Sequence, residues 1–321
     1  MEVDAVILWV DGNDPKHRNK ISPYLKQIQG ENLEFIAAPT RYNSVGEIFY
    51  CVASLFRFAT FLRKIFIITD NQNPNLDCFI KKNFPDSKTK IQIIDHTEIF
   101  EGYERFLPVF NSRAIEACIS RIKDLSEHFI YLNDDMFLLR KVNVEDFFLD
   151  DKIIARGQWR SIFFDSLLKY LKPRKEGIIP YGFKDSMINS ARYLGHRFRY
   201  FHIEHNAHAL RKSLIEQMYR SHPYLRIVNM KHKFRDNSQF NTQSFFFYYA
   251  IDNGFAIKSS DTRLLYMKPV NRGSHYVERK ISLASKDSNL CFGCIGSLDL
   301  ASEKDQKMIR EWMCQFLNIN L

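Results

Sequence analysis

The chain has 321 residues, of which 45% are hydrophobic and 26% charged, and its formal net charge is +9. This composition excludes a disordered chain, and no apolar run approaches the roughly 18 residues that a membrane-spanning helix needs. The excess of basic residues favours an anionic partner: a nucleotide, an acidic glycan, a nucleic acid or a membrane surface. Because the first residues lack a basic leader, we expect no signal peptide and a cytoplasmic protein.

The first half of the chain alternates strand-like and helix-like segments. Short β-branched runs predict strands, and longer segments with apolar residues at helical spacing predict helices. The predicted strands are residues 5–10, 64–70, 90–96 and 128–135, and the predicted helices are residues 46–62 and 112–126. This alternation predicts βαβ units, and therefore an α/β fold with a mostly parallel sheet.

Acidic residues stand where several of these predicted strands end. Asp11 follows the first predicted strand, Asp70 and Asp95 lie at the ends of the next two, and Asp134 and Asp135 stand side by side at the end of the last one. Ligands of open α/β sheets bind beyond the carboxyl ends of the strands, so we expect the binding edge here. Two adjacent carboxylates can hold a divalent cation that bridges a diphosphate, although a solvated turn would have the same sequence. GT-A glycosyltransferases have a short acidic motif at the same place, which favours the metal site by analogy.

The second half of the chain is expected to be mainly helical. Residues 150–200 are strongly basic and predict a helical insertion, with a loop at Pro173 and Gly177 that flanks the site. Apolar residues at helical spacing predict three further helices, at residues 209–220, 241–251 and 305–317.

Three histidines recur at every third position in the segment FHIEHNAHAL. His202, His205 and His208 would share one face of a helix, or converge in an irregular segment. A neutral imidazole accepts a proton near pH 7, so this segment could supply a catalytic base or a phosphate ligand. A three-histidine zinc site and ordinary structural histidines are the alternatives.

Two further segments could contact a phosphorylated ligand. In KHKFRDN, Arg235 could clamp a phosphate through its forked guanidinium, or it could belong to a solvated basic face. In LWVDGNDP, the turn after the first strand could bring the backbone close to a ligand, or be a simple surface turn. The lone Cys291–Cys294 pair is weak evidence for zinc. The residues alone therefore predict metal-assisted transfer on a phosphorylated substrate.

Four segments together resemble the Stealth family, which includes bacterial capsular polysaccharide phosphotransferases and the eukaryotic GlcNAc-1-phosphotransferase of lysosomal enzyme tagging. The segments are DAVILWVDGNDP (4–15); the block from RYNSVGEIFYCVASLFRFATFLRKIFIITDNQNP (41–74) through HTEIF, FNSRAIEACISRI and FIYLNDDMFL; HNAHALRKSLIEQMYRSHP with FRDNSQF; and LASEKDQKMIREWM. They cover more than half of the chain. It departs from the family pattern at Phe49 and Ala53, where arginines are common, and at Gln239, where an acid is frequent.

The resemblance implies a sugar-1-phosphate transferase of capsular or extracellular polysaccharide synthesis. A UDP-sugar such as UDP-GlcNAc would be held with Mg²⁺ or Mn²⁺, a hydroxyl of an oligosaccharide or polysaccharide acceptor would attack phosphorus, and UMP would leave. The implied fold is a mostly parallel Rossmann-like or GT-A-like sheet flanked by helices, with the basic helical insertion and a helical C-terminal part. Residues 1–150 would form the nucleotide-sugar and metal-binding core, and residues 151–321 a mainly helical part that completes the active site within one compact unit.

The resemblance also implies roles for individual residues. Asp134 and Asp135 would bind the metal or order the diphosphate, and Asp135 would thereby take part in catalysis. His205, with His208 nearby, would deprotonate the acceptor or contact the transferred phosphate, and Arg235 would neutralise phosphate charge. The residues expected to bind the substrate are Trp9, Asp11, Gly12, Asp14, Asp70, Gln72, Asn111, Ser112 and Glu116.

Two other functions stay open. A metal-dependent GT-A-type glycosyltransferase would transfer the sugar alone and release UDP. A non-enzymatic anion-binding module would suit the net charge, but strand-end carboxylates would repel a phosphate backbone, so we expect no nucleic-acid partner. Lys172, Arg174 and Lys175 could hold the protein at the inner face of the membrane, beside a capsule assembly complex.

Overall fold

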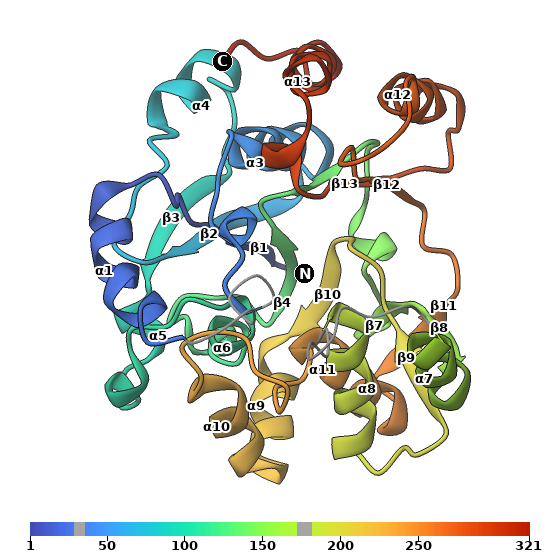
Figure 1. The fold of residues 1–321 in the computed structure, drawn as a ribbon. Coiled ribbons are helices and arrows are strands. Elements are labelled where there is room, and N and C mark those ends of the chain that lie inside the picture. Colours follow the sequence, from blue (N-terminus) through green and yellow to red (C-terminus); the bar gives the residue numbers. More distant parts are fainter. Residues whose placement is uncertain (29–35, 172–181) are drawn as a thin grey trace.

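A central five-stranded sheet organises the protein in this computed structural model, which describes residues 1–28, 36–171 and 182–321 (Figure 1). The strand order is β10-β4-β1-β2-β3, and every neighbouring pair is parallel except β10 with β4, which is antiparallel. The strands are β1 (Val3–Leu8), β2 (Leu62–Thr69), β3 (Lys90–Asp95), β4 (His128–Asn133) and β10 (His208–Arg211). The predicted mostly parallel sheet is therefore confirmed.

Helices follow the strands closely because polar residues at the strand ends also cap the helices. The Asp14 side chain accepts a hydrogen bond from the Lys16 amide at 2.8 Å, and Asp95 accepts one from the Thr97 amide at 2.9 Å. These caps satisfy amide groups that a helix leaves unpaired at its start. The helices of this half are α1 (Pro15–Leu25), α3 (Glu47–Phe58), α4 (Asp77–Asn83), α5 (His96–Ile99) and α6 (Ser112–Glu116).

The helix predicted over residues 112–126 is shorter than expected. α6 ends at Glu116, and a 3-10 turn, η3 (Ile119–Arg121), follows it. The four residues from Arg113 to Glu116 are all buried, so the segment has no solvated face of the kind that an amphipathic surface helix needs. Burial against the rest of the fold therefore outweighs the helical spacing.

The second half contributes strands as well as helices. β10 joins the central sheet, and β5 (Met136–Leu138) pairs with β13 (Phe292–Ile295), which pairs with β12 (Leu264–Met267). β7 (Lys152–Arg156) lies between β6 (Phe148–Leu149) and β11 (Ala256–Ser259), and β8 (Gln158–Ser161) pairs with β9 (Arg199–His202). The helices are α7 (Ile162–Leu171), α8 (Phe183–Tyr193), α9 (Lys212–Ser221), α10 (Pro223–Met230), α11 (Thr242–Asp252), α12 (Tyr276–Lys286) and α13 (Glu303–Phe316).

Three expectations for this half have different outcomes. The helix predicted over residues 209–220 begins only at Lys212, because the residues before it pair with β4. The loop expected at Pro173 and Gly177 lies outside the described residues, as do Lys172, Arg174 and Lys175, the residues expected to contact a membrane. The division of the chain at residue 150 stays a prediction. Within the described ranges, no helix combines the length and the apolar character that crossing a membrane requires.

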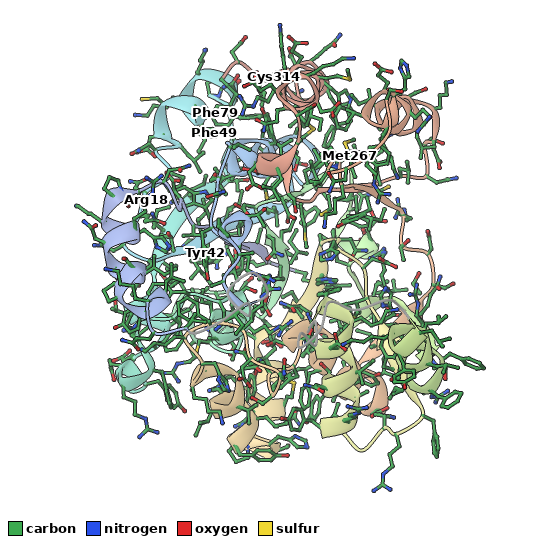
Figure 2. All side chains as sticks on the ribbon, viewed as in Figure 1. Arg18, Tyr42, Phe49, Phe79, Met267 and Cys314 are labelled. Atoms are coloured by element: carbon green, nitrogen blue, oxygen red, sulfur yellow. The ribbon has the colours of Figure 1, made fainter. Side chains whose placement is uncertain are left out.

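Two of the positions that depart from the family pattern lie in the packed interior of the first half. Phe49 of α3 meets Phe79 of α4 edge to face, with ring centroids 5.1 Å apart (Figure 2). Ala53 of α3 is completely buried. Neither residue lines the cavity described below, so these departures do not change its walls.

Candidate active site

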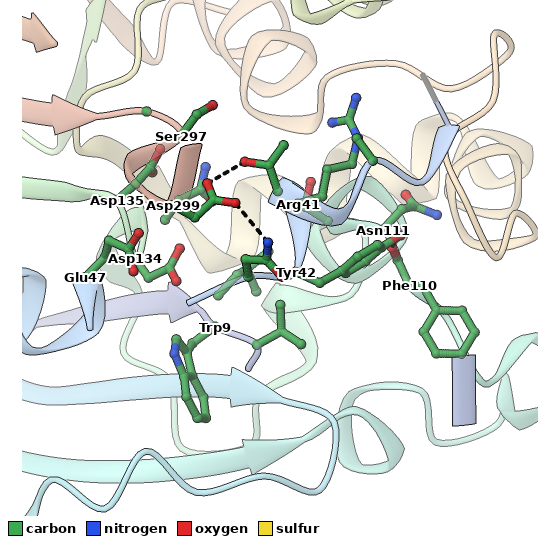
Figure 3. Close-up of a pocket in the computed structure, with 18 of the residues that line it drawn as sticks. Trp9, Arg41, Tyr42, Glu47, Phe110, Asn111, Asp134, Asp135, Ser297 and Asp299 are labelled. Atoms are coloured by element: carbon green, nitrogen blue, oxygen red, sulfur yellow. Dashed lines mark hydrogen bonds between the residues drawn. The ribbon is translucent and has the colours of Figure 1, made fainter. Parts of the chain in front are cut away.

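A cavity of about 460 Å³ lies at the carboxyl ends of β1, β2 and β4 (Figure 3). Its lining combines these strand ends with several residues from the segments 38–47 and 109–115 of the first half. The second half contributes residues 205, 235, 266, 268, 295–297 and 299. The cavity therefore lies at the edge of the sheet where ligand binding was predicted.

Asp134 and Asp135 occupy the turn between β4 and β5, and Glu47 of α3 lies beside them (Figure 3). Both strands are buried almost throughout, so the turn is fixed in place. The Ile295 amide donates a hydrogen bond of 3.0 Å to the Asp135 carbonyl, which attaches the turn to β13. The backbone thus holds two carboxyl groups at the cavity wall.

This acidic cluster, Asp134, Asp135 and Glu47, is electrostatically unfavourable on its own. Burial raises the pKa of Asp134 well above its usual range, and repulsion from Asp135 and Glu47 adds to this. Burial raises the pKa of Asp135 to about 6, and burial also raises the pKa of Glu47. The Cys294 thiol donates to Asp135 Oδ2 at 3.6 Å, while Oδ1 has no hydrogen-bond partner among the described residues. A bound cation would offset the repulsion among these carboxylates, lower their pKa values and give Asp135 Oδ1 a partner.

Guanidinium groups form another part of the cavity wall. Arg41 and Arg235 line the cavity, and Lys268 contributes an ammonium group. Burial, together with the positive charges of Arg41 and Arg113, lowers the pKa of Arg235 to about 9. The basic side chains that line this part of the cavity are therefore a suitable environment for an anion with several oxygens, such as a phosphate.

His205 lines the cavity between two aromatic rings. Its ring stacks on Phe183 at 4.4 Å and on Tyr266 at 5.6 Å, measured between centroids, with interplanar angles of 26° and 22°. Burial lowers the pKa of His205, Glu204 raises it, and Arg235 lowers it again. The imidazole is therefore neutral at pH 7 and fixed in orientation, which are the properties of a proton acceptor.

The other two histidines of the segment do not line the cavity. His202 lies on β9 with its Nε2 at 3.3 Å from Glu204 Oε1. His208 lies on β10, where its ring packs edge-on against Phe247 and burial lowers its pKa to about 3. Within the described residues, no group of three or more His, Cys, Asp or Glu side chains is arranged to hold a metal ion.

Four buried side chains present unpaired polar atoms to the cavity near the ends of β1, β2 and β3. Among the described residues, no hydrogen-bond partner exists for Trp9 Nε1, Asp70 Oδ2, His96 Nδ1 or either ring nitrogen of His17. Burial lowers the pKa of His96 to about 4 and also lowers that of His17, so both rings are neutral at pH 7. Buried polar atoms normally have partners, so this polar cluster (Trp9, His17, Asp70 and His96) indicates a polar ligand.

Residues 11–14 of the loop after β1 support the cavity without lining it. Gln72 Nε2 donates to the Asp11 carbonyl at 2.8 Å and to Asp14 Oδ2 at 3.0 Å. The Gly12 amide donates to the Tyr42 carbonyl at 2.6 Å, and a Cβ at Gly12 would come within 2.8 Å of Tyr42. This loop therefore holds the segment that carries Arg41.

Asn111 uses its side chain to hold the segment that carries Arg235. Its Nδ2 donates to the carbonyls of His232 and Phe234, at 2.6 and 3.1 Å, and its Oδ1 caps α6 by accepting from Ala114 N. Gln239 Nε2 also donates to this Oδ1, at 3.1 Å. Gln239, the third departure from the family pattern, thus helps to hold the basic wall, the part of the cavity lined by Arg41 and Arg235.

Asp299 closes the cavity from the C-terminal side. Its carboxylate accepts from Thr40 Oγ1 at 2.6 Å and from Asn43 Nδ2 at 2.9 Å, as the dashed lines in Figure 3 mark. These two bonds, the Asp299 clasp, join the 3-10 turn η5 (Leu298–Leu300) to the segment around Arg41.

The cavity contains most, but not all, of the predicted site residues. Those that line it are Trp9, Asp70, Asn111, Ser112, Asp134, Asp135, His205 and Arg235, and those that do not are Asp11, Gly12, Asp14, Gln72, Glu116 and His208. Glu116 is buried and accepts a hydrogen bond from the Tyr131 hydroxyl at 3.0 Å. Sequence reasoning missed lining residues that include His17, Arg41, Glu47, His96 and Asp299. His96 could have been found, because it is the last residue of a predicted strand.

Family comparisons match the first half of the chain most clearly. Residues 1–29 match Stealth protein CR1, conserved region 1, and residues 41–156 match Stealth protein CR2, conserved region 2. The chain is 34% identical over 274 residues to the exopolysaccharide phosphotransferase SCO6023 of Streptomyces coelicolor, which is 83% of this chain and 42% of that protein. It is 30% identical over 264 residues to the capsular polysaccharide phosphotransferase LcbA of Aeromonas hydrophila, which is 81% of this chain and 68% of that protein.

A third relative is the capsular polysaccharide phosphotransferase cps1A of Actinobacillus pleuropneumoniae, with 32% identity over 250 residues, 76% of this chain and 63% of that protein. The chain thus spans about half the length of several curated relatives that it matches. Among solved structures, it is similar to the glycosyltransferase GlyE of Streptococcus pneumoniae, with 12% identity and a TM-score of 0.44 over 99% of this chain and 62% of that one. It is also similar to the galactosyltransferase LgtC, with 11% identity and a TM-score of 0.43 over 99% of this chain and 96% of that one.

Proposed function

Since this chain belongs to the Stealth family, we propose that it is a sugar-1-phosphate transferase of capsular or extracellular polysaccharide synthesis. The donor would be a UDP-sugar such as UDP-GlcNAc, and the acceptor a hydroxyl of an oligosaccharide or polysaccharide. The acceptor oxygen forms a bond to the phosphorus attached to the donor sugar, the bond from that phosphorus to the UMP oxygen breaks, and UMP leaves. The reaction would take place in the cytoplasm or at the inner face of the membrane.

One observation carries this proposal: a single cavity unites the buried acidic cluster with Arg41, Arg235 and a neutral, fixed His205. Phosphoryl transfer depends mainly on positioning and on neutralising the charge of phosphate oxygens. In the proposed site, the guanidinium groups bind those oxygens, and His205 accepts the proton of the attacking hydroxyl. Neither task can be assigned to His208, which lies outside the cavity.

Asp134 and Asp135 would hold a Mg²⁺ or Mn²⁺ ion. The unpaired Asp135 Oδ1 and the raised pKa values of both carboxyl groups fit a cation site. Mg²⁺ commonly uses one or two carboxylates and takes its other ligands from water and substrate phosphates, so a preformed cage of three side chains is not required. When bound, such an ion would neutralise charge on the diphosphate.

The polar cluster of Trp9, His17, Asp70 and His96 would receive the nucleoside. An Asp carboxylate is a common partner for ribose hydroxyls in α/β nucleotide sites, and the neutral histidines can pair with hydroxyl or base atoms. With the nucleoside at the ends of β1 to β3 and the ion at the end of β4, the diphosphate would cross the middle of the sheet edge. This arrangement supports a nucleotide-linked donor over a free sugar phosphate.

The test is a screen of nucleotide sugars and glycan acceptors with Mg²⁺ or Mn²⁺, in which chromatography separates UMP from UDP. We expect UMP together with a phosphodiester-linked product. UDP as the sole nucleotide product would contradict the proposal and favour the alternative of a metal-dependent glycosyltransferase, which transfers the sugar alone. Asp135→Asn, checked for folding by circular dichroism, is the matched inactive control.

A further inference from the structure

Helix α7 exposes its apolar side chains to solvent. Phe163, Phe164, Leu168 and Leu171 are 59–68% exposed, and Leu167 is 41% exposed. Surface helices of globular proteins normally turn such residues toward the core. Contiguous apolar surface of this kind marks a site that something else covers.

The side of α7 that faces the protein is polar instead. Asp165 and Lys169, one helical turn apart, form ion pairs of 2.6 Å with Lys184 and Asp185 of α8. The Tyr200 hydroxyl also donates to Asp165, at 2.7 Å. These contacts fix the rotation of the helix, so its apolar side cannot turn inward without breaking both ion pairs.

Phe198 extends this apolar surface and places it beside exposed arginines. Its side chain is 85% exposed, and its carbonyl accepts a hydrogen bond of 2.9 Å from the Ile162 amide at the start of α7. Arg197 and Arg199, on either side of Phe198, are exposed as well. Figure 1 shows α7 at the outer edge of the molecule, away from the central sheet.

We propose that α7 and Phe198 form a docking surface for a bilayer that contains anionic lipids. Interfacial helices insert aromatic and leucine side chains at the level of the headgroups, while neighbouring arginines pair with lipid phosphates. The net charge of +9 complements the same partner. With ten residues, α7 is too short to span a bilayer and would lie along its surface.

Charge favours a lipid surface over a second copy of this chain. A two-fold symmetric dimer formed through α7 would bring the arginines around Phe198 close to those of the other copy. An anionic bilayer has no such repulsion. The surface also adjoins the cavity wall, because α8, which holds α7, begins with the Phe183 ring that stacks on His205.

The experiment measures co-sedimentation of the full chain with phosphatidylcholine vesicles that contain or lack phosphatidylglycerol. We expect the chain to bind the anionic vesicles more strongly, and the double variant Phe164→Ser/Leu168→Ser to bind them at least about tenfold more weakly. Tyr224→Ser/Leu300→Ser, at positions 55% and 54% exposed on other elements, is the matched control and should bind like the original chain. Arg197→Gln should reduce the preference for anionic vesicles.

Three results would overturn the proposal: no vesicle binding by the original chain, equal binding by the α7 variant, or no preference for anionic vesicles. Sedimentation velocity provides the remaining test. A concentration-dependent dimer that the α7 variant abolishes, without vesicle binding, would assign the surface to a second copy. Circular dichroism verifies that each variant is folded, and none of these residues lines the cavity.

Discussion

The acidic and basic parts of the cavity wall are built in different ways. The acidic pair occupies one turn between two buried strands, and a backbone hydrogen bond attaches this turn to β13. Arg41 and Arg235 lie 194 positions apart in the chain, and the segments that carry them are held by side-chain hydrogen bonds of Asn111 and Asp299. The two aspartates are thus neighbours in the sequence, whereas the two arginines are brought together only by contacts between distant segments.

The largest effect should come from Asp135→Asn, which removes a charge from the acidic cluster but keeps its shape. We expect product formation to fall to background, because a divalent ion contributes several kcal/mol of charge stabilisation that Asn cannot recruit. Steady-state release of nucleotide measures this loss. Wild-type turnover in the variant would show that the acidic turn is not part of the catalytic machinery.

Next in size is His205→Ala, which removes the proposed proton acceptor and should lower turnover about 10²–10⁴-fold. In the original chain the neutral ring is the active form, and its pKa lies below 6.5, so activity should fall only as the pH drops below that value. The pH profile of kcat/KM provides the check. If kcat/KM of the variant falls at low pH as it does in the original chain, His205 is not the proton acceptor.

Arg235→Lys keeps the charge of the basic wall but loses the forked geometry. We expect turnover to drop about 10- to 100-fold, since an ammonium group cannot form two parallel bonds to one phosphate. Lys268→Arg is the companion variant, and it should be tolerated if the charge there serves as a point charge. The comparison of kcat and KM for the two variants measures the difference.

The acidic pair, the His205 segment and Arg235 could be predicted from sequence because each lies in a short, chemically unusual stretch. Arg41, His17 and Asp299 were missed, because ordinary polar residues gain a role here only through the long-range contacts that bring them to the cavity. For the same reason β10 was predicted as part of a helix: its pairing with β4 is invisible in local spacing. The parallel sheet was predictable because buried β-branched runs carry their own signal.

Gln239→Glu tests the support of the basic wall. The amide donates to Asn111 Oδ1 and to the Asn229 carbonyl at 3.1 and 2.8 Å, and a carboxylate would place acceptors against acceptors. We expect the free energy of unfolding to fall by about 1–3 kcal/mol and turnover to fall about tenfold. Chemical denaturation measures the first, and the exposed Gln315→Glu is the control. Unchanged turnover in Gln239→Glu would mean that the segment carrying Arg235 does not depend on these hydrogen bonds.

The smallest effect concerns stability and pH. The folded-state pKa of Asp135 is about 6, raised from 3.8, so the folded chain binds this proton more tightly than the unfolded chain does. Its contribution to the free energy of unfolding therefore decreases as the pH rises from about 4 to about 6. Without divalent ions, denaturation at several pH values should show this decrease in the original chain and a weaker one in Asp135→Asn. Identical curves would indicate that Asp135 is solvated.

The Asp299 clasp makes an N-terminal loop depend on residues near the far end of the chain. A shortened fragment that stops before residue 290 would keep both conserved regions, at residues 1–29 and 41–156, yet leave Thr40 and Asn43 without their anchor. Truncation mapping would then trace lost activity to a part of the chain that lies outside both conserved regions. Fragments for expression should therefore extend past this carboxylate.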